Sequence, residues 1–108
     1  MQTITDNETP FACNMSALNA DEKKRTLELL GLLKTKRQEI KELPDGYAFR
    51  FATDNEIIKN AAEFITFERL CCPFFEFELA VKENGSTWLR FRGNEGVKDF
   101  IKIEFDFS

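Results

Sequence analysis

The stretch F-E-F-E-L-A-V-K-E-N-G-S-T-W-L-R-F-R, residues Phe75–Arg92, indicates how this chain folds. Apolar and polar residues alternate on both sides of a central Asn-Gly, and this pattern is typical of a half-buried β-hairpin. The sequence therefore predicts two antiparallel strands, at about 75–81 and 88–91, with one face turned toward a core.

The register of this hairpin follows from the cost of burying charge. A two-residue Asn-Gly loop would turn Arg90 and Arg92 toward the apolar face, where unpaired charges are strongly disfavoured. A three-residue loop over Glu83–Gly85, with Gly85 as the bulge residue, keeps both arginines on the polar face. This register predicts two apolar cross-strand pairs: Leu79 with Leu89, and Phe77 with Phe91.

A second hairpin is predicted nearer the start of the chain. Leu43-Pro44-Asp45-Gly46 has the composition of a turn, because Pro presets φ, Asp bonds its own backbone and Gly accepts a positive φ. The following residues alternate over 47–51 as a half-buried strand would. The first strand of this hairpin is expected at about 37–43.

Three helices complete the expected elements: one before the first hairpin, one after the second hairpin, and a central one between the two hairpins. Asn19 and Glu22 form a capping box before a helix at 20–34. Residues 95–107 fit either a strand or a helix by their spacing, and we favour a helix at 95–104.

The central helix is expected at 54–72. Thr53 and Glu56 are spaced as a capping box at its start, and Pro73 ends it because the residue before a proline is pushed out of the α region.

These elements predict an α+β fold in the order α-β-β-α-β-β-α. Two hairpins form a four-stranded antiparallel sheet, and the helices pack on one of its faces. At 108 residues the chain has the size of a single domain, 1–108, with residues 1–10 expected to be a flexible arm.

Charge and composition exclude several classes of function. The net charge is −4 with acidic and basic residues interspersed, so no basic patch predicts nucleic-acid binding. No apolar run approaches the roughly 20 residues of a membrane-spanning helix. The first residues lack the basic and apolar regions of a secretion signal, so we expect a cytoplasmic protein with no membrane partner.

The candidate functional residues lie in E-R-L-C-C-P-F, residues Glu68–Phe74. On a helical wheel Glu68 falls within the apolar stripe of the central helix, and Cys71 and Cys72 lie on either side of it. An isolated charge at such a position is costly, so Glu68 must be neutral, paired or facing a polar cavity. Arg50 is an available cation, as are Arg90 or Arg92.

A metal or small-ligand site is the interpretation we favour. Adjacent helical residues diverge by about 100°, so Cys71 and Cys72 need a third ligand to hold an ion. Cys13, in the arm before the first helix, can supply it. The predicted ligands are Cys13, Cys71, Cys72 and Glu68, with Arg50 beside them, and thiolates select zinc, copper(I) or another thiophilic metal or metalloid.

Other interpretations of the same residues stay open. Cys71 and Cys72 can be small core fillers, and Glu68 can form a structural ion pair. Trp88, Arg90 and Arg92 on the second hairpin can form a protein-interaction or homodimer surface. A thiol redox protein is a third alternative, although the negative end of a helix and the absence of histidine disfavour an activated thiolate.

The chain resembles a family of small bacterial proteins of uncharacterised function. The resemblance covers most of the chain and rests on three main motifs: C-N-M-S-A-L at Cys13–Leu18, L-P-D-G-Y-A-F-R-F at Leu43–Phe51, and E-R-L-C-C-P-F at Glu68–Phe74. A fourth similar stretch is G-N-E-G-V-K at Gly93–Lys98. The resemblance implies no activity, cofactor or catalytic residue.

Overall fold

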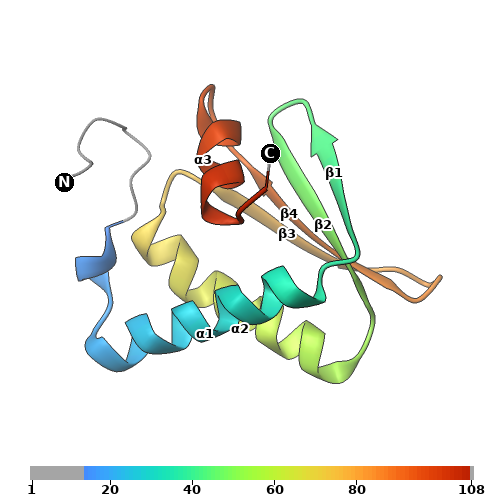
Figure 1. Cartoon of the computed structure of the whole chain (residues 1–108), viewed down its shortest axis with the longest axis horizontal. Helices are drawn as coiled ribbons and strands as arrows, with labels where there is room; N and C mark the ends of the chain where they lie inside the picture. The colour runs from blue at the N-terminus through green and yellow to red at the C-terminus, as the bar shows by residue number, and fades with distance from the viewer. Residues whose placement is uncertain (1–13, 108) are drawn as a thin grey trace.

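The computed structural model of the chain describes residues 14–107, and the expected arm at 1–10 lies outside this range. The α+β class and the order α-β-β-α-β-β-α are confirmed. The elements are a 3-10 turn η2 (Met15–Ala17), α1 (Ala20–Lys36), β1 (Glu39–Leu43), β2 (Gly46–Ala52), α2 (Asn55–Cys71), β3 (Glu76–Val81), β4 (Ser86–Arg92) and α3 (Val97–Glu104). The helices cover one face of a four-stranded antiparallel sheet with strand order β1-β2-β4-β3 (Figure 1).

The predicted register of the second hairpin is confirmed. Phe77 pairs with Phe91 and Leu79 with Leu89. The backbone N–H of Lys82 donates to the Ser86 carbonyl across the three-residue loop, and Gly85 has a φ of 86°. Alternation along the two strands therefore places their apolar residues toward the helices and their arginines on the opposite face.

The first hairpin forms where it was predicted, but its glycine has a different role. Leu43 pairs with Gly46, so the loop contains only Pro44 and Asp45. Gly46 does not have a positive φ. Instead, a Cβ atom at Gly46 would collide with the backbone carbonyl of Phe91 on the neighbouring strand. The glycine is needed for the close approach of two strands, not for the turn.

Phenylalanine rings form the centre of the core between the sheet and α2. The Phe105 ring, just after α3, lies 4.7 Å from the ring centroid of Phe49 and 4.9 Å from that of Phe91. It also contacts Phe64 of α2 at 6.1 Å. These ring contacts fix the end of α3 against both the sheet and the central helix.

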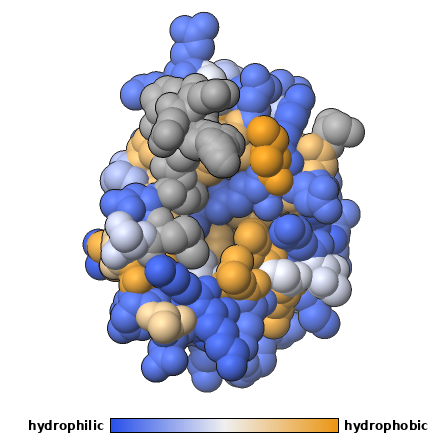
Figure 2. Space-filling model, turned by 60° about the vertical axis from the view of Figure 1, so that its left-hand side comes forward, coloured by the Kyte–Doolittle hydropathy of each residue, from blue (hydrophilic) through white to orange (hydrophobic). Residues whose placement is uncertain are grey.

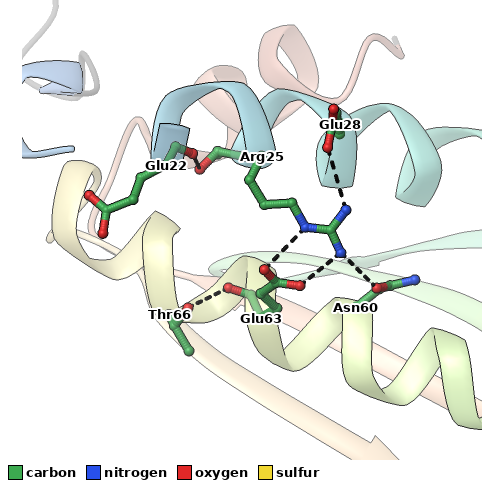
Figure 3. Close-up of polar contacts among 7 residues, drawn as sticks. Glu22, Arg25, Glu28, Asn60, Glu63 and Thr66 are labelled. Atoms are coloured by element: carbon green, nitrogen blue, oxygen red, sulfur yellow. Dashed lines mark hydrogen bonds and ion pairs between the residues drawn. The ribbon is translucent and has the colours of Figure 1, made fainter. Parts of the chain in front are cut away.

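A polar network on the outer side joins α1 to α2 (Figure 3). The Arg25 guanidinium donates to Glu63 with contacts of 2.9 and 3.1 Å and also reaches Asn60. Glu28, one turn along α1, accepts from the same guanidinium. Because these groups are largely solvated, the network orients the two helices more than it stabilises them.

The capping box of Asn19 and Glu22 at the start of α1 is confirmed.

The start of α2 differs from the prediction. Asp54, not Thr53, is the N-cap, and its carboxylate accepts a 2.8 Å hydrogen bond from the Ile57 backbone N–H. The Thr53 hydroxyl is hydrogen-bonded to the Thr87 hydroxyl on β4, at 2.7 Å. A capping box over Thr53 and Glu56 was therefore wrong, because a tertiary contact with the sheet engages the threonine instead.

The surface is mainly polar on the face shown in Figure 2, with smaller apolar patches between the hydrophilic side chains. None of the helices within residues 14–107 is long and apolar enough to cross a membrane.

Replacing the α2 cap tests this assignment. We expect Asp54→Ala to lower the free energy of unfolding by about 1 kcal/mol, because the Ile57 N–H loses its acceptor. Asp54→Asn should retain most of the stability, since asparagine caps as well as aspartate does. Urea denaturation measures both variants, and equal losses in the two would rule out capping as the role of this side chain.

Candidate metal site at the end of the central helix

Glu68 is buried on the inner face of α2, as its wheel position predicted. Its side chain is 1% exposed and follows Phe64 by four residues on the same face of the helix. Its Oε2 atom is enclosed, and the polar groups beside this carboxyl group, those of Cys71 and Glu104, are themselves acids. A buried polar atom in this state is energetically unfavourable, so the position is not explained by packing alone.

Two sulfur atoms lie beside this carboxylate. Cys71 Sγ is 3.8 Å from Glu68 Oε1 and 3.8 Å from Cys72 Sγ. One oxygen of Glu68 and the two sulfur atoms all lie within 4.8 Å of one another, and all three residues are buried. Three of the predicted ligands therefore meet in one cluster, which we call the Glu68–Cys71–Cys72 cluster.

The end of α2 explains how two adjacent cysteines approach the same point. The helix ends at Cys71, and Cys72 has φ −127° and ψ 69°, outside the helical region. This end is one residue earlier than predicted, and Pro73 accounts for the non-helical backbone before it. The divergence of about 100° between adjacent helical residues therefore does not apply to this pair.

The two cysteines differ in their bonding. Cys71 is a free thiol, whereas Cys72 is disulfide-bonded. The sequence alone leaves the redox state of the three cysteines open, since their number is odd. Cys72 is therefore available as a thiolate ligand only after reduction.

The segment that precedes α1 lies against the end of α2. The backbone N–H of Asn14 donates to the Cys71 carbonyl oxygen at 2.7 Å. Cys13, the third predicted thiolate, directly precedes Asn14 but lies outside the described residues.

Glu104 lies beside Glu68 but outside the group of three ligand atoms, and the sequence did not reveal this neighbour. It is the last residue of α3, and its carboxyl group is hydrogen-bonded to that of Glu68. Its Oε1 atom is enclosed and has no partner. Glu104 is 36 residues beyond Glu68, and only the docking of α3 through Phe105 brings the two together, so no local spacing could have indicated the pair.

Burial makes the three acids Glu68, Glu104 and Cys71 weaker than usual. Desolvation raises the pKa of Glu68, and desolvation together with Glu68 raises that of Glu104 to about 10. The pKa of Cys71 rises to about 12, first through burial and then through the two carboxylates. A raised thiol pKa disfavours the reactive thiolate that a redox enzyme needs.

The arginines do not join the cluster. Arg50 forms an ion pair with Glu39 across β1 and β2, at 3.3 Å. Among the ion pairs within residues 14–107, none includes Glu68. The interpretation of Glu68 as half of a structural ion pair with a core arginine therefore has no support here.

The polar face of the second hairpin is arranged as predicted. Arg90 lies over the Trp88 ring at 5.9 Å, and the Trp88 side chain is half-buried. Arg92 is 3.5 Å from Glu78. These side chains interact with one another within the chain, and a homodimer or interaction surface at this face stays a prediction.

Comparison with known proteins identifies no relative. No protein-family model, curated protein or solved structure matches this chain.

The Glu104 carboxyl group should make stability fall as pH rises. Its pKa is about 10 in the folded state and 4.5 in the absence of perturbation, so the folded protein keeps a proton that the unfolded chain loses within this window. We expect Glu104→Gln to raise the melting temperature by several degrees at about pH 8. This gain should shrink toward pH 4.5.

Thermal unfolding followed across this pH range measures the effect. Asp99→Asn on the same helix is the control, since the Asp99 side chain is exposed. If the melting temperatures of the wild type and Glu104→Gln change in parallel with pH, Glu104 is not protonated in the folded state.

Proposed function

We propose that the reduced protein binds a soft or borderline metal ion at the Glu68–Cys71–Cys72 cluster. The observation that carries the proposal is the convergence of one carboxylate oxygen and two sulfur atoms, all within 4.8 Å of one another and all buried. Carboxylate and thiolate groups are both established ligands of zinc and related ions.

The spacing of the donors supports this proposal. In a tetrahedral zinc site with bonds of about 2.3 Å to sulfur, two sulfur ligands lie about 3.8 Å apart. The distance between Cys71 Sγ and Cys72 Sγ is 3.8 Å. An ion could therefore bind between these sulfur atoms with little rearrangement of the backbone.

The buried carboxyl group distinguishes a ligand site from a packed core. A small cysteine is a common core residue, but a glutamate that is 1% exposed, with another carboxyl group and a thiol as its polar neighbours, is not. A cation bound beside Glu68 would compensate the charge of the ionised carboxylate. It would also favour the thiolate of Cys71, since a bound metal deprotonates its thiol ligands.

Cys13 remains part of the proposal as a further thiolate. Its neighbour Asn14 is hydrogen-bonded to the end of α2, which is where the two other sulfur atoms lie. With three thiolates the site would suit cadmium or a thiophilic metalloid as well as zinc or copper(I).

Cadmium titration of the fully reduced protein tests the proposal. We expect one Cd²⁺ per chain, with thiolate-to-metal absorption in the ultraviolet that reports sulfur ligation. Cys71→Ser should weaken binding about tenfold or more, because the cluster loses its central sulfur atom. Isothermal titration calorimetry measures the affinity.

Leu70→Ser provides the matched control. Leu70 is the neighbour of Cys71 on α2, and its side chain is 43% exposed, so this change should leave the affinity unaltered. The proposal fails if the reduced wild type shows no stoichiometric binding, or if Cys71→Ser binds as tightly as Leu70→Ser does.

Binding should depend on the redox state of Cys72. Reduction of its disulfide by a small dithiol adds two electrons and two protons and yields two thiols, while the dithiol becomes a disulfide. We expect the oxidised protein to bind Cd²⁺ at least about tenfold more weakly than the reduced protein, because Cys72 cannot then form a thiolate. Equal affinities would exclude Cys72 as a ligand. Mass spectrometry after alkylation confirms which redox state was titrated.

A further inference from the structure

We infer that the chain forms a homodimer through the open edge of β3. The β3 strand of a second copy pairs with it in antiparallel orientation, so that one sheet continues across both copies. This inference goes beyond the proposed function and does not rest on the metal site.

The two edges of the sheet differ in character. The strand order β1-β2-β4-β3 leaves one side of β1 and one side of β3 without a neighbouring strand within residues 14–107 (Figure 1). Three of the five residues of β1 are charged and exposed, and charged side chains protect an edge strand from pairing. On β3 the side chains of Phe77 and Leu79 are only half-buried, and that of Val81 is 52% exposed. The edge of β3 is therefore the one suited to a further strand.

The hydrogen bonds of the hairpin show which backbone groups of β3 face its open edge. The N–H of Lys82 donates to the Ser86 carbonyl at 2.8 Å, so the even-numbered residues of β3 bond to β4. The N–H of Gly93 donates to the Asp45 carbonyl at 3.0 Å, which agrees with this alternation because it directs the odd-numbered residues of β4 toward β2. The N–H and C=O groups at the open edge therefore belong to Phe77, Leu79 and Val81.

These three residues can pair with themselves in a symmetric dimer. When a twofold axis relates two antiparallel strands, one residue lies opposite its own copy. With Leu79 at that position, Phe77 lies opposite Val81 of the second copy, and all three have backbone groups directed at the partner. Their side chains share the face that carries the core, so the pairing also removes the exposed Val81 side chain from water.

Charge favours this register. It places Glu76 opposite Lys82 of the second copy, and the symmetry repeats the pair. Both side chains are exposed, and neither belongs to an ion pair in the part of the chain that the structure describes. A register centred on Glu78 would bring two like charges together. One centred on Ala80 would pair Lys82 with Glu78, which already lies 3.5 Å from Arg92 of its own chain.

Charge reversal tests the interface and its register. Sedimentation equilibrium of the full chain, kept reduced to prevent disulfide cross-linking, measures the dissociation constant of the dimer. We expect Glu76→Lys alone and Lys82→Glu alone each to raise this constant about tenfold or more, because two attractive pairs become repulsive. Combining the two changes should restore the constant to within about threefold of the wild type, because opposite charges meet again. Lys41→Glu, on the exposed face of β1, is the matched control and should leave it unchanged.

Backbone hydrogen exchange locates the interface independently of the side chains. The N–H groups of Phe77, Leu79 and Val81 are open to water in a monomer and hydrogen-bonded in the dimer. Their exchange should therefore slow about tenfold or more as the protein concentration rises through the dissociation constant. The N–H groups of Glu78 and Ala80 bond to β4 in both states and serve as internal controls.

Val81→Pro removes one open-edge N–H without disturbing the bonds to β4, and proline is tolerated on an edge strand. It should also weaken the dimer, with circular dichroism showing that the variant is folded. The inference is wrong if the reduced wild type stays monomeric at millimolar concentration, even if its edge then accepts an extended segment of another protein. It is equally wrong if the dimer survives both single charge reversals, or if Trp88→Ala dissociates it and Val81→Pro does not.

Discussion

The burial of the Glu68 carboxyl group is the constraint on which the candidate site depends. An acidic side chain at this position of α2 gives up its hydration, and its polar neighbours, Glu104 and Cys71, are themselves acids. Apolar burial elsewhere must therefore compensate this cost of desolvation. Much of that burial lies in the packed phenylalanine rings around Phe49, Phe91 and Phe105. The protein tolerates an unfavourable polar position inside an otherwise apolar core. Positions of this kind are often associated with ligand binding or catalysis.

Three separate backbone features bring the chemical groups to this carboxyl group. Pro73 ends α2 so that Cys72 leaves the helical path and its sulfur atom approaches that of Cys71. The segment at Asn14 is bonded to the last turn of the same helix. Phe105 holds the end of α3 in the core, and Glu104 is carried to the cluster with it. The donors that meet within 4.8 Å come from Glu68, Cys71 and Cys72 at the end of α2, and the segment at Asn14 and α3 pack beside them.

Much of the fold was predictable because it follows from local patterns. Alternation of apolar and polar residues set the strands, and the cost of burying Arg90 and Arg92 selected the correct hairpin loop. The capping box at Asn19 was predictable for the same reason, since it involves only residues within one helical turn. The N-cap of α2 was not, because Thr53 has a partner, Thr87, that is distant in the sequence. Likewise, the pairing of Arg50 with Glu39 depends on how two strands align.

The sequence by itself determined the α+β architecture, the inward direction of Glu68 and the presence of two cysteines beside it. These features depend on the periodicity of one helix and the alternation of two hairpins, which the residues themselves express. Only the tertiary structure decided that Glu104 meets Glu68, that the arginines lie elsewhere, and that Cys72 is disulfide-bonded while Cys71 is free. The physical reason is that such contacts join side chains separated by tens of residues. Their proximity results from the packing of whole elements against a shared core and leaves no local pattern in the sequence.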